Sequence, residues 1–278
     1  MAALGRILGP PMRCRSWVRR AIRLAALLAG SQILMLGVMA DLAVASGAGN
    51  VTIYYAGING PMGIAAGPDE TLWFTNSGNN SIGRITTTGK VTNYKATGIS
   101  YPLWITAGPD GALWFTNYYG GLIGRITTKG RITHYSTGTS NPGAITAGPD
   151  KSLWFTNTPS SISRITTTGK VTNYTGGGIN ESAGIALGPD GALWFTNGTP
   201  SVGRITATGK VTIYARTDLS RPFGITAGPD DALWFVNSGS NSIGRITTTV
   251  TPKISSFTPT SSAAASLVTP GPACCQRQ

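Results

Sequence analysis

Two kinds of charged side chain recur along this sequence at intervals of about 40 residues. The acids each follow a Gly-Pro pair, and they are Asp69, Asp110, Asp150, Asp190 and Asp230. The arginines each precede an Ile-Thr pair, and they are Arg84, Arg125, Arg164, Arg204 and Arg245. A ring of carboxylates could hold a cation, and a ring of guanidinium groups could hold an anion or an acidic sugar. Because a repeated scaffold copies its contacts in every unit, we expect instead that each Asp caps a turn and that each Arg pairs with a neighbouring repeat.

Other groups that could move a proton or bind a metal are scarce. His134 is the one histidine, and other repeats have Asn or Ile at its position, so we expect an exposed polar side chain and not a base. Glu70 lies in a turn, whereas Glu181 lies in a loop and is the better-placed carboxylate. A single glutamate is a poor magnesium site. The three cysteines have no spacing typical of a zinc site or a disulfide framework.

The triplet Leu-Trp-Phe shows which elements must position these groups. It begins at spacings of 41, 40, 40 and 40 residues, at Leu72, Leu113, Leu153, Leu193 and Leu233. Each unit divides into four short segments rich in β-branched and aromatic residues, separated by Gly-Pro-Asp, Ser/Asn/Gly-rich and Thr-Gly-Lys turns. Four strands in a repeat of this length are typical of a β-propeller blade. An open solenoid is the competing repeat fold, but it would need distinct polar caps.

The two ends of the repeat region predict a closed ring. Residues 51–55 match the fourth strand of other units, such as residues 211–214, whereas the last unit ends at Thr249 without that strand. We therefore expect the N-terminal strand to join the last blade, which removes two free edges. The predicted fold class is all-β, a β-propeller of about five four-stranded blades over residues 46–249.

The first 45 residues predict export. Arginines up to Arg23 precede an uncharged run over residues 24–40 and a small-x-small motif at residues 43–45. This order is typical of a signal peptide that is cleaved, with an uncleaved anchor as the alternative. We expect a signal peptide over residues 1–45, a secreted, periplasmic or cell-surface location, and membrane contact through this segment alone.

Charge and composition exclude several classes of protein. The chain has 22 Lys and Arg against 10 Asp and Glu, a net charge of +12, and removal of residues 1–45 leaves +7. The remaining charge forms no basic stripe, so a nucleic-acid partner is not expected. A hydrophobic content of 41% and a mean hydropathy of +0.05 exclude a solvated disordered chain and a multi-span membrane protein.

Residues 250–278 leave the repeat pattern. Residues 253–262 resemble the opening of a TIG-type immunoglobulin-like domain, and the rest of that domain is missing. We expect a disordered tail or the truncated start of such a domain. A fragment of a longer surface protein is an alternative that the sequence leaves open.

Residues that differ between repeats are better candidates for a binding site than residues that are copied. The variable segments are the loops between the fourth and first strands and between the second and third strands, which lie on one face of a propeller near its central opening. The candidate ligand-binding residues are Tyr101, Trp104, Tyr118, Tyr119, Glu181, Asp218 and Arg221. They could form a shallow pocket for a polar or cyclic ligand, although loop aromatics can also serve plain packing.

Two motifs carry a family resemblance that spans all five repeats. Residues 108–117 and 188–197 read Gly-Pro-Asp-Gly-Ala-Leu-Trp-Phe-Thr-Asn, and residues 81–87 and 242–248 read Ser-Ile-Gly-Arg-Ile-Thr-Thr. These units resemble those of virginiamycin B lyases, a family of streptogramin lyases. The resemblance implies a seven-bladed propeller and a magnesium-dependent enzyme that linearises type B streptogramins by eliminating their ester bond. It also implies a His after the Pro that opens a blade and a Glu that ends Trp-Phe-Thr-Glu.

This sequence departs from the family pattern at both positions. The Glu position holds Asn76, Asn117, Asn157, Asn197 and Asn237. The His position holds Met62, Leu103, Gly143, Ala183 and Phe223. We therefore expect no catalytic residues and no metal site, and a non-catalytic binding or scaffold module, with a streptogramin B lyase as the alternative. No cofactor is expected, with Mg²⁺ only if the lyase alternative holds. We also expect a small or polymeric ligand on the loop face, and we expect the protein to be a monomer.

Overall fold

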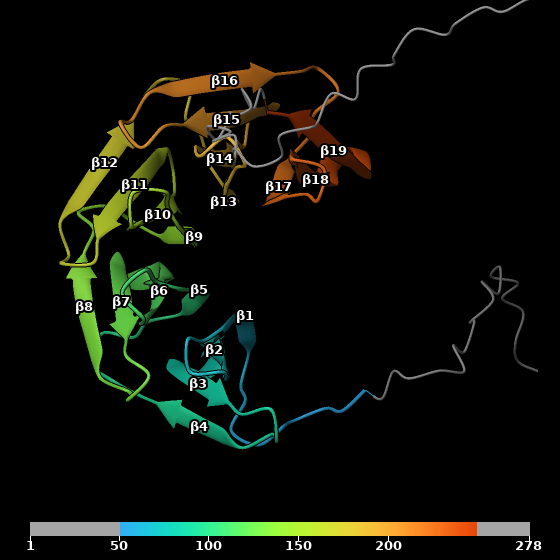
Figure 1. Cartoon of the computed structure of the whole chain (residues 1–278). Coiled ribbons are helices and arrows are strands. Elements are labelled where there is room, and N and C mark those ends of the chain that lie inside the picture. The colour runs from blue at the N-terminus through green and yellow to red at the C-terminus, as the bar shows by residue number, and fades with distance from the viewer. Residues whose placement is uncertain (1–50, 249–278) are drawn as a thin grey trace, which may run out of the picture. The chain divides into compact units, whose positions relative to one another are not determined.

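The computed structural model describes residues 51–248, which form five antiparallel β-sheets (Figure 1). The expected all-β, blade-like architecture is confirmed. The predicted signal peptide over residues 1–45 and the predicted tail over residues 250–278 lie outside the described residues. In the described part of the chain, no helix has the length and apolar character needed to cross a membrane.

Strands that are adjacent in the sequence pair with one another in every sheet. The first sheet contains β1 (Pro61–Ala66), β2 (Leu72–Asn76), β3 (Ser81–Ile85) and β4 (Val91–Tyr94). The second contains β5 (Pro102–Ala107), β6 (Leu113–Asn117), β7 (Leu122–Ile126) and β8 (Ile132–Ser136). The third contains β9 (Pro142–Ala147), β10 (Ser152–Asn157), β11 (Ser161–Thr166) and β12 (Val171–Thr175). The fourth contains β13 (Ile185–Leu187), β14 (Leu193–Thr196), β15 (Ser201–Ile205) and β16 (Val211–Ala215), and the fifth contains β17 (Pro222–Ala227), β18 (Ala232–Asn237) and β19 (Ser242–Thr247).

The repeated residue types fix the register inside each sheet. The Gly-Pro-Asp turn closes through a backbone bond, in which Gly67 N donates to Thr71 O at 2.7 Å. The antiparallel pairing of β2 with β3 then places Trp73 opposite Arg84 and Phe74 opposite Gly83. A Cβ added at Gly83 would lie 2.2 Å from the Phe74 ring, so the glycine is needed for this close approach. The same pairs recur in the other four sheets, except that Ser163 replaces the glycine in the third.

The hydrophobic core lies between neighbouring sheets. Trp73 and Ile82 of the first sheet pack in one cluster with Ile105, Leu113 and Phe115 of the second sheet. Equivalent clusters join the second sheet to the third, the third to the fourth and the fourth to the fifth. The tryptophans of the first four Leu-Trp-Phe triplets all lie in these clusters between sheets. Figure 1 shows the first strands β1, β5, β9, β13 and β17 on the inner side of this row of sheets.

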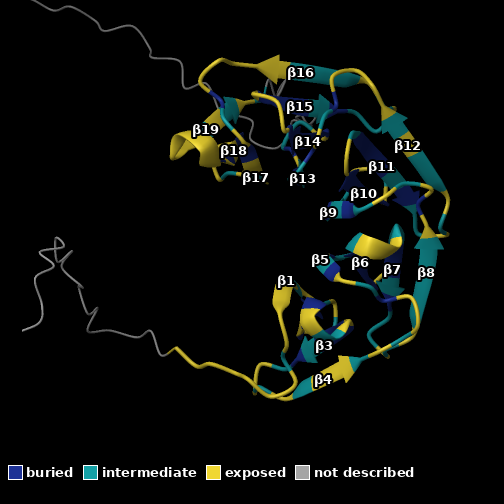
Figure 2. Ribbon diagram, turned by 180° about the vertical axis from the view of Figure 1, so that it is seen from behind, coloured by how far each residue is buried: buried dark blue, intermediate teal, exposed yellow. Residues whose placement is uncertain are grey.

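The two ends of the row differ from the predicted closed ring. The last sheet has three strands, and residues 51–55 form no strand. Figure 2 shows exposed residues along the terminal strands β1 and β19. Trp234 of the last sheet is 36% exposed, whereas its four counterparts are at most 2% exposed. Tyr54 lies against Gly89 of the first sheet as Tyr94 lies against Gly130 of the second, which is the contact that the outer strand of one sheet makes with the next sheet.

Candidate ligand-binding face

Each repeated Asp accepts two side-chain hydrogen bonds inside its own sheet. In the second sheet, Trp114 Nε1 donates to Asp110 Oδ1 at 2.9 Å, and Arg125 Nε donates to Asp110 Oδ2 at 2.6 Å. The same two contacts occur in the other four sheets. The expectation that each Arg pairs with a neighbouring repeat is therefore wrong. Because Trp and Arg face each other on adjacent strands, both reach the turn Asp of their own sheet.

These contacts hold the repeated carboxylates in their charged form. Burial raises the pKa of Asp110, but the hydrogen bonds from Trp114 and Arg125 outweigh burial and keep that pKa below its ordinary value. Hydrogen bonds from Trp234 and Arg245 lower the pKa of Asp230 to about 2. The repeated Asp residues thus join a turn to the third strand and are not free to act as acids or bases near neutral pH.

Acidic and imidazole side chains do not cluster in the described part of the chain. Over residues 51–248, no three His, Cys, Asp or Glu side chains gather closely enough to hold a metal ion. Mg²⁺ itself is often held by one or two carboxylates together with waters or substrate oxygens.

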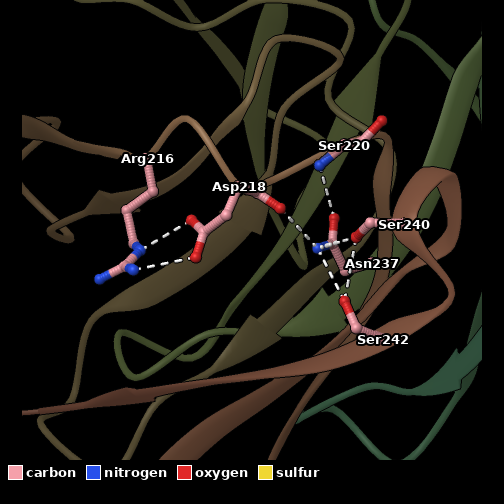
Figure 3. A network of polar contacts seen from close by, with 6 residues as sticks. All are labelled: Arg216, Asp218, Ser220, Asn237, Ser240 and Ser242. Atoms are coloured by element: carbon pink, nitrogen blue, oxygen red, sulfur yellow. Dashed lines mark hydrogen bonds and ion pairs between the residues drawn. The ribbon is translucent and has the colours of Figure 1, made fainter.

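The asparagines at the family's Glu position anchor the loops before the first strands. Asn237 Oδ1 accepts a bond from Ser220 N at 2.6 Å, and its Nδ2 donates to Asp218 O at 3.2 Å and to Ser242 Oγ at 3.0 Å (Figure 3). Asn76 and Asn197 make corresponding bonds. Sequence reasoning noted these residues as the absence of Glu and missed this role. Their identity in all five repeats was the signal that could have revealed it.

The residue directly before β1, β5, β9 and β17 has a left-handed backbone, and so has the equivalent residue four positions before β13 begins. The φ angles lie between +43° and +55°, at Gly60, Tyr101, Asn141, Glu181 and Arg221. In four sheets the carbonyl of this residue accepts a loop bond, such as that from Tyr118 N to Tyr101 O at 3.2 Å. A left-handed conformation costs a non-glycine residue about 1–3 kcal/mol, and such residues cluster at functional sites; in this chain the residue after the turn Asp adopts it as well, at Glu70, Lys151 and Asp231. One structural position therefore carries five different side chains, four of them in a conformation that favours glycine.

Three of the predicted site residues form an aromatic cluster at the second sheet. Tyr101 precedes β5, and Tyr118 and Tyr119 lie in the short turn η2 (Tyr118–Gly120). The ring centroids of Tyr101 and Tyr119 are 4.9 Å apart, and those of Tyr118 and Tyr119 are 5.2 Å apart. Tyr119 is 68% exposed, and Trp104 on the inner strand β5 is also exposed. The cluster thus presents aromatic surface to solvent at the loop end of this sheet.

The predicted charged residues lie at other sheets. Glu181 precedes β13, where its side chain covers Gly198, and Arg221 precedes β17. Asp218 forms a two-bonded ion pair with Arg216, at 2.9 Å for each bond, on the exposed loop before β17 (Figure 3). The structure therefore places these residues in equivalent loops of the fourth and fifth sheets, and it gives Asp218 a partner that sequence reasoning did not name.

His134 lies on β8 and is half-buried, not exposed as expected. Burial lowers its pKa below the ordinary value, and its ring meets Phe115 edge-on at 6.2 Å. Its Nε2 and the Nδ2 of Asn117 are the two buried side-chain polar atoms without a hydrogen-bond partner in residues 51–248. In the first sheet, the same two positions hold Asn76 and Asn93, which bond at 3.0 Å.

A cavity of about 650 Å³ lies at the loop end of the fourth sheet. It is lined by residues 178–180, residues 199–201 and the strand β16, and most of this lining is apolar. Sequence reasoning missed it. The loop after Asn197 is one residue shorter than the loop after Asn76, and this shortening was the available signal.

Comparison with known protein families shows which family this chain belongs to. A profile described as the Virginiamycin B lyase family matches residues 50–274. The chain belongs to the virginiamycin B lyase family. This result confirms the resemblance read from the repeats, whereas the TIG-like reading of residues 253–262 found no support. A comparison with curated proteins found no match.

Solved structures of the family agree with this assignment. Virginiamycin B lyase from Staphylococcus aureus is 40% identical, with a TM-score of 0.65, over 68% of this chain and 67% of that chain. A streptogramin B lyase structure is 36% identical, with a TM-score of 0.65, over 72% of this chain and 68% of that chain. The described chain therefore spans about two thirds of these enzymes. A chain of a nidogen–laminin complex, 18% identical with a TM-score of 0.57, shares the fold alone.

Proposed function

We propose that this family member is an exported, non-catalytic binding module that uses the loop end of its sheets. The observation that carries the proposal is the position before each first strand, where five different residues occupy one left-handed conformation. Contacts that serve only the scaffold are copied in every repeat, as the bonds of the turn Asp residues are. At this position the left-handed backbone costs free energy and the side chain differs from repeat to repeat. This combination suits recognition of an asymmetric ligand better than it suits packing of the scaffold.

The chemistry of the described residues supports binding without turnover. The positions at which the family resemblance implies a Glu hold buried asparagines that anchor loops. The one histidine lies on the outer strand β8, where burial lowers its pKa and its ring packs beside Gly98 and edge-on to Phe115. The exposed rings of Tyr101 and Tyr119 offer flat apolar surface, and Glu181 and Arg221 add one charge of each sign. Such a surface suits a cyclic peptide or another polar ligand with apolar faces.

A streptogramin B lyase is the second candidate function, and family membership favours it. Among the similar structures is a catalytically inactive variant of virginiamycin B lyase from Staphylococcus aureus with quinupristin, 39% identical over 68% of this chain. Quinupristin is therefore a suitable probe for both candidates. A lyase would consume it, and a binding module would retain it.

Quinupristin titrated into the full chain by isothermal calorimetry tests the binding surface. We expect binding that Tyr119→Ala weakens about fivefold to tenfold, because loss of one stacked ring removes about 1–1.5 kcal/mol. The matched control is Tyr214→Ala, because Tyr214 is partly exposed but lies on the outer strand β16. Equal affinity for the wild type and both variants would contradict a ligand site at the tyrosine cluster.

A further inference from the structure

The two end sheets each expose a face that the inner sheets bury. At each junction between neighbouring sheets, a Trp and a β-branched residue of the earlier sheet pack on Leu and Phe of the later sheet, as Trp73 and Ile82 do on Leu113. The other three junctions repeat this pattern. Among residues 51–248, the first sheet has no earlier neighbour and the last sheet has no later one.

The uncovered face of the last sheet has the residues that begin a further junction. Ile243 is 63% exposed, whereas its counterparts are buried at Ile82, Ile123, Ile162 and Val202. A hollow of about 370 Å³ lies on this face and is lined in part by Trp234, Val236 and Ile243. Val236 stands where the other sheets have Thr, which makes the face more apolar. An exposed apolar face of this kind is typical of a protein–protein contact.

The first strand of the last sheet also lacks a neighbour. A Cβ added at Gly184, next to β13, would lie 2.3 Å from Phe223 O, because β17 of the next sheet passes close by. A Cβ added at Gly63 on β1 would likewise lie 2.7 Å from Leu103 O on β5. A Cβ added at the equivalent Gly224 on β17 would meet nothing within 4 Å. The space beside β17 therefore fits the first strand of another sheet of the same kind.

The uncovered face of the first sheet has the complementary residues. Ile64 on β1 is 65% exposed, and Leu72 on β2 is exposed as well. Their counterparts in the second sheet, Ile105 and Leu113, are buried against the first sheet. The first sheet thus presents the half of a junction that receives the Trp and the β-branched residue of an earlier sheet.

Tyr54 and Trp234 each make one half of a contact that is whole in the complete sheets. Tyr94 stacks on Trp73 of its own sheet, with ring centroids 5.4 Å apart, and it also lies against a glycine of the next sheet. Tyr54 lies against Gly89 in the same way, but within residues 51–248 no Trp stacks on it. Trp234 has no stacked Tyr in this part of the chain. Residues 51–55 therefore lie where the outer strand of a preceding sheet would lie.

We propose that the last sheet of one copy packs on the first sheet of a second copy, whose residues 51–55 become the fourth strand of that last sheet. The register of the complete sheets then stacks Tyr54 on Trp234 and places Tyr55 opposite Ser242. Both faces stay exposed in one chain while its four junctions are packed, so a second copy covers them without rearrangement.

This contact joins two different faces, so it is heterologous. Further copies can add in the same direction, either to an open chain or to a closed ring. The pairing of residues 51–55 with the last sheet agrees with the repeat pattern, but it occurs between copies and not within one chain. It differs from the monomer that we expected from the sequence, and it does not depend on the proposed binding function.

Sedimentation velocity of the full chain over a range of concentrations tests this association. We expect the wild-type mass to exceed the 28.8 kDa of one chain and to rise with concentration. Ile64→Glu should block the first-sheet face and Ile243→Glu the last-sheet face, so each variant alone should sediment as a single chain. An equimolar mixture of the two variants should form a complex of two chains and nothing larger, because each variant keeps one intact face.

The matched control is Leu187→Glu. Leu187 is also exposed on a first strand, but it lies on β13 of the fourth sheet, away from both end faces, so association should be unchanged. Circular dichroism should show the same β content in all these proteins. A single-chain mass for the wild type up to its solubility limit, or no complex in the mixture, would overturn the proposal.

Paired cysteines identify the strand that docks. In chains with Cys14, Cys274 and Cys275 changed to Ser, one chain carries Tyr55→Cys and another carries Ser242→Cys. Opposite residues of an antiparallel pair are close enough for a disulfide. After mild oxidation of the mixture, we expect mass spectrometry to show mainly a covalent dimer of unlike chains. An intramolecular disulfide as the main product of a chain with both changes would overturn the proposal, since residues 51–55 would then close their own chain.

Discussion

Asn117 and His134 show how one substitution can interrupt hydrogen bonds that are repeated in the other sheets. The asparagine that ends each second strand is buried and bonds to the loop before the first strand, and in the first sheet it also bonds to an Asn of the outer strand. In the second sheet His134 occupies that outer-strand position, and neither Asn117 Nδ2 nor His134 Nε2 finds a partner. A buried donor without an acceptor costs about 1–3 kcal/mol. The second sheet therefore carries a local defect that the other sheets do not share.

Replacement of His134 by the residue of the first and third sheets should repair this defect. We expect His134→Asn to raise the free energy of unfolding by about 1 kcal/mol, because its side-chain oxygen can accept the Asn117 Nδ2 bond. The measurement is urea unfolding of the full chain at pH 7. Ile213→Asn is the control, because Asn197 in that sheet already donates to Gly178 O and Ser201 Oγ, so it should give no gain.

His134→Asn should also change how the free energy of unfolding depends on pH. Burial keeps the pKa of His134 below its ordinary value of about 6.5 in the folded chain, so the unfolded chain binds more protons as the pH falls below that value. Stability due to this group is thus complete above pH 6.5 and declines as the pH falls toward the lower folded pKa. His134→Asn should remove that part of the decline. An identical pH profile for both proteins would contradict the assignment.

At the scale of the strand, the Asp–Trp–Arg contacts join three segments of each sheet. The turn Asp, the Trp of the second strand and the Arg of the third strand meet because the register sets the last two opposite each other. Repeat spacing predicted the strands and turns well, since Gly-Pro-Asp and Thr-Gly-Lys have strong turn preferences. It did not predict the partner of each Arg. The repeat pattern gives the order of the strands, but it does not say which side chains on neighbouring strands point to the same face of the sheet.

Loss of a partly buried Arg–Asp pair inside a sheet should lower the free energy of unfolding more than loss of an exposed ion pair. We expect Arg125→Met to lower the free energy of unfolding by about 1–3 kcal/mol, because Asp110 stays charged and loses a close donor, and Arg125 also lies 5.9 Å from the Trp114 ring centre. Arg216→Met is the matched control, since its pair with Asp218 is exposed and solvent screens it, so its loss should lower the free energy of unfolding much less. Equal losses measured by urea unfolding would contradict the structural role of the repeated Asp.

At the scale of the whole repeat region, the number of sheets was predictable and the state of its ends was not. Five Leu-Trp-Phe triplets predicted five sheets. Ring closure depends on the angle between neighbouring blades, which arises from side-chain packing in clusters such as Trp194 with Leu233 and Phe235. Of the candidate site, the sequence identified the variable loops and the three tyrosines that meet. It could not identify the left-handed positions, because a backbone angle depends on the loop bonds around it.

We propose that this member of the virginiamycin B lyase family binds its ligand without converting it. The most direct test is to incubate a molar excess of quinupristin, together with Mg²⁺, with the full chain and to follow the drug by liquid chromatography and mass spectrometry. We expect quinupristin to open no faster than in a protein-free control over many hours. Linear product that accumulates in proportion to protein concentration, for more than one turnover, would contradict it.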